Sequence, residues 1–189
     1  MILYGSTTSP YVRRIRMFLA DTAHEFVDWQ IFAGDRKQLA DKNPTLKIPM
    51  LEADGQVIFD SRQIHRFLSE SFQHSRLTWD QENTLSVIDA ANDSLVQLLI
   101  LTRSGFDIND DVLYFNIQRE RVEGILVHLE QCVQEGQFSK WDYLAISLFC
   151  LLDWIAFRAL WDLSGYPALN GFLQRHQNND WAQKTDPRR

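Results

Sequence analysis

The distribution of proline divides this sequence into two kinds of structure. Proline cannot stand inside a helix or a central strand, because it lacks an amide hydrogen and its ring blocks the preceding turn. Pro10, Pro44 and Pro49 fall in the first part of the chain, whereas no proline occurs between Pro49 and Pro167. We therefore expect short elements separated by turns in the first part and long helices in the second.

The beginning of the first part alternates between strand-like and helix-like patterns. The apolar run 2–4 predicts a short strand, and Pro10 opens a stretch in which apolar residues recur at helical spacing. Aromatic and β-branched residues over 26–31 predict a second strand, and the polar stretch 35–41 that follows predicts a short helix.

A hairpin and a helix complete the first part. The apolar runs 50–52 and 57–59 flank Asp54-Gly55, a pair typical of the tight turn of an antiparallel hairpin because both turn residues need positive φ. An apolar stripe over 64–72 then predicts a helix, with Ser61 as its N-cap. The predicted order is β-α-β-α-β-β-α, and a proline directly before the hairpin makes it a thioredoxin-like arrangement.

The second part has only helical patterns. Apolar residues at helical spacing predict long helices over 85–99 and 112–129, the first stopped near Gly105. Ser139 to Asp142 has the form of a capping box before the almost wholly apolar stretch 143–161, which predicts a core helix. We expect Pro167 to begin a final helix and the residues from Asn178 onward to form a polar tail. We thus predict an α+β chain with a thioredoxin-like domain at 1–75 and an all-α helical bundle at 82–189.

Composition and charge exclude several classes of protein. Of the 189 residues, 45% are apolar and 23% charged, which is typical of a globular protein. Residues 1–80 carry 10 basic and 10 acidic side chains, and residues 81–189 carry 9 and 15, so the whole net charge of -6 lies in the second part. An acidic chain is a poor ligand for nucleic acid or an anionic membrane, and we expect neither partner.

The cysteine and histidine patterns point to neither a disulfide framework nor a metal site. Cys132 and Cys150 lie in helical stretches, no CxxC occurs, and the five histidines are scattered. The longest near-apolar run, 143–152, is about half of the ~20 residues that a membrane span needs, and the N-terminus lacks the pattern of a secretory signal. We therefore expect a cytoplasmic protein without a metal.

Four segments carry a resemblance to a known family. Residues 6–14 (STTSPYVRR) resemble the opening of bacterial cytosolic glutathione S-transferases, and so do residues 43–51 (NPTLKIPML). Phe59-Asp60-Ser61 and the box at 139–142 with its apolar helix add to this resemblance, which covers nearly the whole chain. Each segment alone is weak, but the four occur in the right order and on the right predicted elements.

Ser9 is the residue to which the resemblance assigns catalysis. From the sequence alone, Ser9 before Pro10 is the N-cap of the first helix. A helix N-terminus offers free N–H groups and a positive dipole end, so a thiolate brought there is stabilised and a hydroxyl can donate to it. The family pattern implies that Ser9 activates glutathione in this way, with Ser6 and Thr7 as alternatives. A serine forms no mixed disulfide, which disfavours thiol-disulfide chemistry.

The resemblance also implies where glutathione is held. It places a cis peptide bond at Ile48-Pro49, so that the backbone N–H and C=O of Ile48 pair with the cysteinyl part of the peptide. Asp60-Ser61 at the start of a helix would meet the ammonium and carboxylate groups of the γ-glutamyl end. Lys47 would take the glycine carboxylate, with Lys37 as the alternative.

The resemblance implies a homodimeric glutathione S-transferase that conjugates glutathione to a small hydrophobic electrophile, a detoxification reaction. It leaves open a catalytically weak or inactive dimeric binding or regulatory protein of the same fold, and a glutathione-dependent peroxidase. The electrophile is not identified by the sequence. The candidates for the wall of its site are Leu98, Leu99, Thr102 and Arg103.

Two further features of the sequence lead to expectations that a structure can test. Leu46 stands where many members of the family have glycine, which predicts a stiffer loop before Lys47. Arg13, Arg14 and Arg16 point in different directions along a helix, and we expect part of this group to form a solvated or interdomain face.

Overall fold

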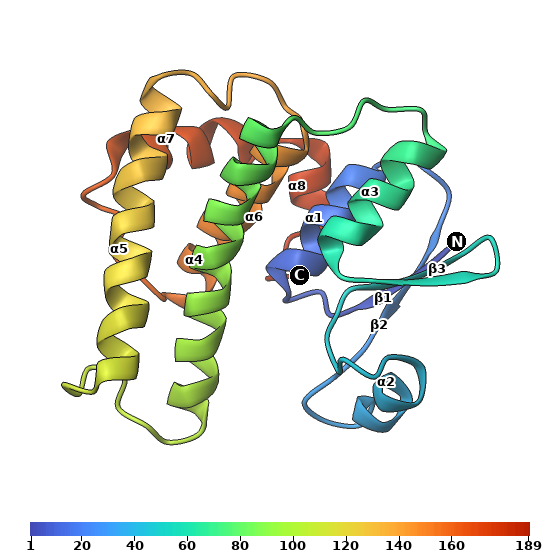
Figure 1. Cartoon of the computed structure of the whole chain (residues 1–189), viewed down its shortest axis with the longest axis horizontal. Helices are drawn as coiled ribbons and strands as arrows, with labels where there is room; N and C mark the ends of the chain where they lie inside the picture. The colour runs from blue at the N-terminus through green and yellow to red at the C-terminus, as the bar shows by residue number, and fades with distance from the viewer. The chain divides into compact units, whose positions relative to one another are not determined.

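The computed structural model describes all 189 residues and divides into two compact units (Figure 1). Unit 1 comprises Met1–Leu77 and Asn179–Arg189, and unit 2 comprises Thr78–Asn178. The sequence predicts residues 179–189 as the polar tail of the helical domain, whereas in the structure they contain a short helix and belong to unit 1. This difference arises because the last residues pack against a buried arginine of unit 1, described below.

Unit 1 contains a four-stranded mixed sheet with the strand order β2-β1-β3-β4. Strand β1 pairs with β2 in parallel and with β3 antiparallel, and β3 and β4 form an antiparallel hairpin. The observed order is the predicted β-α-β-α-β-β-α followed by a C-terminal helix. The elements are β1 (Ile2–Gly5), α1 (Pro10–Leu19), β2 (Glu25–Asp28), α2 (Arg36–Lys42), β3 (Met50–Ala53), β4 (Gln56–Phe59), α3 (Ser61–Ser71) and α8 (Asp180–Lys184).

Successive side chains of a strand point to opposite faces of the sheet, and different helices cover the two faces. Tyr4 and Met50 point to the face where Leu39 of α2 and Trp29 complete a small core. Leu3 and Leu51, their neighbours in the strands, are fully buried on the opposite side. Helix α3 contacts β3 and β4 and packs beside α1 (Figure 1).

The turn between β3 and β4 confirms the expectation from Asp54-Gly55. Ala53 and Gln56 are paired across the hairpin, which leaves two residues in the turn. Asp54 has φ 51° and Gly55 has φ 73°, the two positive values that this kind of turn needs.

Unit 2 is wholly helical, as predicted. Its central helix α6 (Tyr143–Arg158) is buried along nearly its whole length, and Asp142 caps it by accepting hydrogen bonds from the amides of Leu144 and Ala145. Helix α6 packs against α4 (Trp79–Arg103) and α7 (Pro167–His176), and α4 and α7 both pack against α5 (Leu113–Gln134).

Helix α4 alone is long and apolar enough to cross a membrane by length and composition. Its apolar face is used within unit 2, because Leu85, Ile88 and Leu95 are buried where α4 packs against α5 and α6. We therefore interpret α4 as a core helix of unit 2.

One local expectation about unit 1 is wrong. Asp60, rather than Ser61, is the N-cap of α3, since its Oδ1 accepts a hydrogen bond from the amide of Arg62 at 2.8 Å and Ser61 is already helical. Of the three arginines of α1, Arg13 and Arg14 are buried and Arg16 is partly exposed. The buried guanidinium groups donate hydrogen bonds to acceptors in α3 and in the C-terminal segment.

Candidate functional site

The register of the sheet brings the predicted site residues to one end of unit 1. Met50 is paired with Tyr4 on one side and with Phe59 on the other. The loop after β1, the residues before β3 and the residues after β4 therefore leave the sheet at the same end. These three segments contain Ser9, Ile48-Pro49 and Asp60-Ser61.

Ser9 is the N-cap of α1, as predicted, with Pro10 in the first turn. Its Oγ accepts a hydrogen bond from the amide of Val12 at 3.3 Å. A hydroxyl that accepts in this way keeps its own proton for another acceptor, and no group of the chain takes that proton. Ser9 can thus donate to an anion at the N-terminus of α1, where the helix dipole favours negative charge.

The other hydroxyls of this loop are engaged within the chain. Thr7 donates through its amide to Asp28 Oδ1 at 2.9 Å and through its hydroxyl to Asp28 Oδ2 at 3.3 Å. Ser6 Oγ and Thr8 Oγ1 are hydrogen-bonded to each other at 3.2 Å. Asp28 ends β2 opposite Gly5, so the parallel pairing of β1 and β2 holds the loop in place.

The peptide bond between Ile48 and Pro49 is cis, as the resemblance implied. Pro49 is buried and Ile48 is partly exposed. The ladder between β1 and β3 begins only at Met50, and neither the amide nor the carbonyl of Ile48 forms a hydrogen bond within the chain. An extended peptide could pair with both groups, as an added strand does.

Asn43 shapes the loop before this peptide bond. It is fully buried, its amide Nδ2 donates to the carbonyl of Lys47 at 2.8 Å, and its Oδ1 accepts from the amide and the hydroxyl of Thr45. Leu46 has φ 56°, a conformation that favours glycine, which explains why glycine suits this position.

Asp60 and Ser61 begin α3. Asp60 is exposed and Ser61 is almost fully buried, with 2% of its surface accessible. Ser61 Oγ accepts a hydrogen bond of 2.6 Å from Nη2 of Arg14, which reaches it from α1. Helix α1 is therefore in direct contact with the first turn of α3.

The two lysines considered for the glycine carboxylate are both exposed. Lys47 is in the loop before Ile48, whereas Lys37 is on α2. Lys47 is thus closer along the chain to the cis peptide bond. No group of three or more His, Cys, Asp or Glu side chains in the chain is placed to hold a metal ion.

One titratable side chain, a histidine, lies close to the contact between α1 and α3. His65 of α3 is buried, and its Nε2 is 3.2 Å from Ser69 Oγ. Burial lowers the pKa of His65 to about 4, with smaller contributions from the charges of Arg14 and His74. His65 is therefore neutral at pH 7 and adds no charge next to Arg14.

Sequence reasoning missed three residues that support the site. Asp28 and Arg14 act through contacts between separate elements, and no local pattern marks them. Asn43 could have been found, since Asn-Pro-Thr is typical of a turn in which an Asn side chain bonds to the backbone two residues on.

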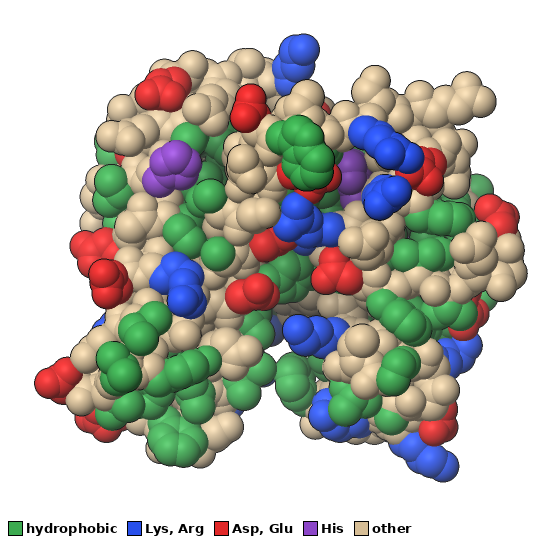
Figure 2. Space-filling view, in the orientation of Figure 1, with side chains coloured by type: hydrophobic (Ala, Val, Ile, Leu, Met, Phe, Trp, Pro, Cys, Tyr) green, Lys and Arg blue, Asp and Glu red, His purple; other side chains and the backbone are tan.

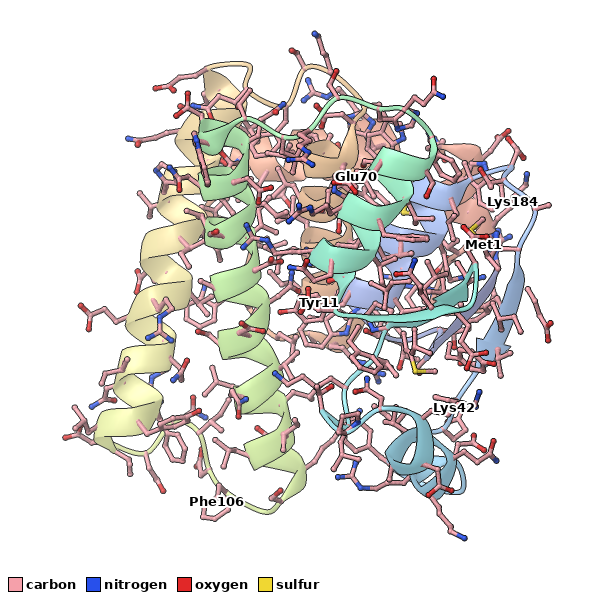
Figure 3. All side chains as sticks on the ribbon, turned by 45° about the vertical axis from the view of Figure 1, so that its right-hand side comes forward. Met1, Tyr11, Lys42, Glu70, Phe106 and Lys184 are labelled. Atoms are coloured by element: carbon pink, nitrogen blue, oxygen red, sulfur yellow. The ribbon has the colours of Figure 1, made fainter.

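The proposed wall of the second-substrate site lies in unit 2, at the C-terminal end of α4. Leu98 is buried, Leu99 is partly exposed, and Thr102 and Arg103 are exposed, with Thr102 Oγ1 donating to the carbonyl of Leu98. Exposed hydrophobic side chains lie around the end of α4 and the start of α5, at the lower left of Figure 2. Phe106, labelled in Figure 3, and Leu113 are the most exposed of them.

Comparison with protein families matches residues 3–76 to the N-terminal domain of glutathione S-transferases. No curated protein is significantly similar in sequence.

Solved structures extend the match to nearly the whole chain. A glutathione transferase family member from Pseudomonas fluorescens Pf-5, solved with glutathione, has 25% identity and a TM-score of 0.78, covering 97% of each chain. A glutathione S-transferase from Methylobacillus flagellatus KT has 22% identity and a TM-score of 0.84, covering 97% of this chain and 98% of that one. Glutathione S-transferase 1-6 from Anopheles dirus species B has 18% identity and a TM-score of 0.77, covering 98% and 95%. The chain therefore has the glutathione transferase fold, with a glutathione S-transferase N-terminal domain at residues 3–76.

Proposed function

We propose that the protein is a glutathione S-transferase that adds the thiolate of glutathione to a small hydrophobic electrophile. The observation that carries this proposal is the convergence at one end of the sheet of a helix N-terminus with a donor hydroxyl, an unpaired strand edge and a second helix N-terminus. Each of the three matches the chemistry of one part of glutathione. The glutathione bound in the Pseudomonas fluorescens relative supports the same ligand.

Ser9 would act on the thiol. A thiolate next to α1 would receive a hydrogen bond from the Ser9 hydroxyl and the favourable potential of the helix dipole. Both lower the pKa of a bound thiol, so that more of it is thiolate at neutral pH and able to attack. Ser9 is favoured over Thr7 because the Thr7 hydroxyl already donates to Asp28.

The peptide would be held along its length. The backbone of Ile48, before Pro49, would pair with the cysteinyl residue. Ser61 and Asp60 at the start of α3 would meet the carboxylate and the ammonium of the γ-glutamyl end. Lys47 would meet the glycine carboxylate, with Lys37 as the alternative.

The character of the second substrate and the oligomeric state of the protein are also part of the proposed function. The apolar side chains exposed around the end of α4 and the start of α5, together with Leu98, Leu99, Thr102 and Arg103, favour a hydrophobic electrophile. We also propose a cytoplasmic homodimer, on the pattern of the family that the sequence resembles.

Calorimetric titration with reduced glutathione tests the binding part of the proposal. We expect saturable binding by the wild type and weaker binding by Ser61→Ala, whereas Ser71→Ala, at the exposed end of the same helix, should bind as the wild type does. A wild-type chain that binds no glutathione would contradict the proposal and favour a regulatory protein of the same fold.

Ser9→Ala tests the catalytic part. Its turnover with a model electrophile should fall much more than its affinity for glutathione, and the pKa of the bound thiol, followed by thiolate absorbance, should rise. Unchanged turnover would remove Ser9 from the mechanism. Turnover with hydroperoxides but not with conjugating electrophiles would identify a peroxidase instead.

A further inference from the structure

Two arginines of unit 2 stand at the ends of helices that pack against each other. Arg103 is the last residue of α4, and Arg158 is the last residue of α6. Arg103 is exposed, whereas Arg158 is half-buried and its Nε is fully buried. Burial lowers the pKa of Arg158, and the nearby positive charge of Arg103 lowers it further. Two like charges therefore lie close together in the part of the chain that carries its whole net negative charge.

Neither guanidinium group is neutralised within the chain. No side-chain hydrogen bond or ion pair joins either of them to another residue. The acidic side chains nearest to them in the sequence are engaged elsewhere, since Asp107 accepts hydrogen bonds within its own loop and Asp162 accepts from the amide and the hydroxyl of Ser164. A half-buried guanidinium without an acceptor is costly, because its lost contacts with water are not replaced.

Neither arginine is needed to cap its helix. At the end of α4, the carbonyls of residues 100–102 accept hydrogen bonds from the amides of residues 104–106. At the end of α6, the carbonyls of Ile155 and Ala156 accept from the amides of Leu160 and Ala159. The backbone therefore satisfies the last carbonyls of both helices, and the N–H groups of the two arginines remain for another acceptor.

The ring of Phe157 holds the guanidinium of Arg158 from one side. Its centroid is 4.3 Å from Cζ of Arg158, which is a cation–π contact. Such a contact uses the flat face of the guanidinium and leaves the N–H groups at its edge for an acceptor in the same plane. The planar fork of these groups matches the two oxygens of a carboxylate.

Apolar side chains lie beside the positive charge of Arg103. Leu99 is partly exposed, and Ile100 and Phe106 are exposed around the end of α4 (Figure 3). A ligand held by both kinds of side chain would combine an apolar body with a negatively charged group.

We propose that Arg103 and Arg158 bind the carboxylate of the second substrate, so that the preferred electrophile is a hydrophobic organic acid. The inference rests on the proposed function and narrows the class of the electrophile. With a chlorodinitrobenzoate, for example, the sulfur of glutathione bonds to the ring carbon, chloride leaves with the electron pair of the broken bond, and the thiol proton goes to solvent. The carboxylate takes no part in this exchange and stays with the arginines.

Calorimetry of the full chain with 3,5-dinitrobenzoate tests the carboxylate site without turnover, because this ligand has no leaving group. We expect saturable binding by the wild type and roughly tenfold weaker binding by Arg103→Met and by Arg158→Met, the size of one lost charge-assisted interaction. Arg158→Lys, which keeps the charge but not the fork, should recover part of the loss. The methyl ester of the same acid should bind the wild type and the variants equally.

Turnover with 4-chloro-3,5-dinitrobenzoate and with its methyl ester tests the role in the reaction. Each rate is divided by the uncatalysed rate, since the ester group activates the ring differently. In the two Met variants, kcat/KM should fall roughly tenfold for the acid and stay within about twofold for the ester. The affinity for glutathione should not change.

Arg175→Met is the matched control. Arg175 is exposed in the last turn of α7, so it is also an arginine near a helix end of unit 2, but its charge does not act on Arg158. This variant should bind 3,5-dinitrobenzoate and turn over both electrophiles as the wild type does.

Several results would overturn the inference. Equal losses for the acid and the ester in the Arg103 and Arg158 variants would mean that these arginines only support the fold of unit 2. A wild-type chain that does not bind 3,5-dinitrobenzoate, or variants that bind it unchanged, would mean that they hold no carboxylate. Weaker glutathione binding in the variants would assign them to a carboxylate of glutathione instead.

Failure of the proposed function would look different. A wild-type chain that binds 3,5-dinitrobenzoate through the two arginines but binds no glutathione would overturn the transferase proposal. The assignment of the carboxylate to a second substrate would then be wrong, although the carboxylate site itself would be confirmed.

Discussion

Arg13 Nε donates a hydrogen bond of 3.3 Å to Thr185 Oγ1, which joins α1 to the last residues of the chain. The same guanidinium donates to the carbonyl of Ala182 at 3.0 Å. Arg13, Ala182 and Thr185 are all buried. The C-terminal segment is therefore part of the structure that holds α1, the helix that begins after Ser9.

Loss of this contact should destabilise unit 1. Thr185→Val keeps the shape of the side chain but removes the acceptor for Arg13, and we expect a free energy of unfolding about 1 kcal/mol lower in urea denaturation. A chain that ends at Asn178 should lose more, because the acceptors of Arg13 at Ala182 and at Thr185 are both removed. Removal of Arg189 alone, at the exposed end of the segment, is the control and should have little effect. Equal stability of the chain ending at Asn178 would show that the segment is dispensable.

Gly5→Ala should disturb the approach of β1 to α1. A Cβ at Gly5 would lie 2.4 Å from Cγ2 of Val12, far inside normal contact distance. We expect a loss of about 1–3 kcal/mol in the free energy of unfolding, the usual range for overpacking. Gly34→Ala, where the added Cβ meets nothing within 4 Å, should be close to neutral. Restoration of stability by Val12→Ala in the Gly5→Ala chain would identify this contact as the cause, and its failure would exclude it.

His65 should make stability depend on pH. Its pKa is about 4 in the folded chain and near 6.5 when unfolded, so the unfolded chain binds the proton first. The stability that neutral His65 contributes is complete above pH 6.5 and is lost as pH falls from 6.5 toward 4. Between pH 7 and pH 5 this amounts to about 2 kcal/mol.

The measurement is urea denaturation of the wild type and His65→Gln at both pH values. The variant cannot take up this proton, so its free energy of unfolding should fall less on acidification. Parallel pH profiles for the wild type and His65→Gln would contradict the assignment.

Glu130 should stabilise unit 2 by capping a neighbouring helix. This buried carboxylate of α5 accepts from the amide of Ala168 at 2.8 Å and from the amide of Leu169 at 2.9 Å, at the start of α7. Glu130→Gln loses the charge and one acceptor, with an expected cost of about 1.5–3 kcal/mol by thermal or chemical denaturation. Glu120→Gln, exposed on the same helix, should change stability by less than about 0.5 kcal/mol.

Much of the fold follows from local patterns. The Asp54-Gly55 turn, the helix starts at Pro10 and Pro167 and the apolar core helix after residue 142 all depend on residues close together in the chain, and each occurs where predicted. The predicted capping box differs in detail, because Asp142 and not Ser139 is the N-cap of the core helix. Ser9 as a helix cap was predictable for the same reason.

The support of the candidate site depends on long-range contacts. No local pattern links Arg14 to Ser61, Thr7 to Asp28 or Arg13 to the C-terminal segment, because each pair joins separate elements. Arginine in a helix is ordinarily exposed, and the acceptors brought by α3 and the C-terminal segment favour the burial of Arg13 and Arg14.

The sequence by itself determined the elements, their order and the chemical character of the residues at their ends, since capping, turn conformation and apolar spacing act within a few residues. The tertiary structure decided which of these ends meet. The pairing of Tyr4, Met50 and Phe59 places three segments at one end of the sheet, and the packing of α1 against α3 turns a buried arginine toward a serine. Such contacts arise from the simultaneous burial of side chains that are distant in sequence, which no short stretch of residues encodes.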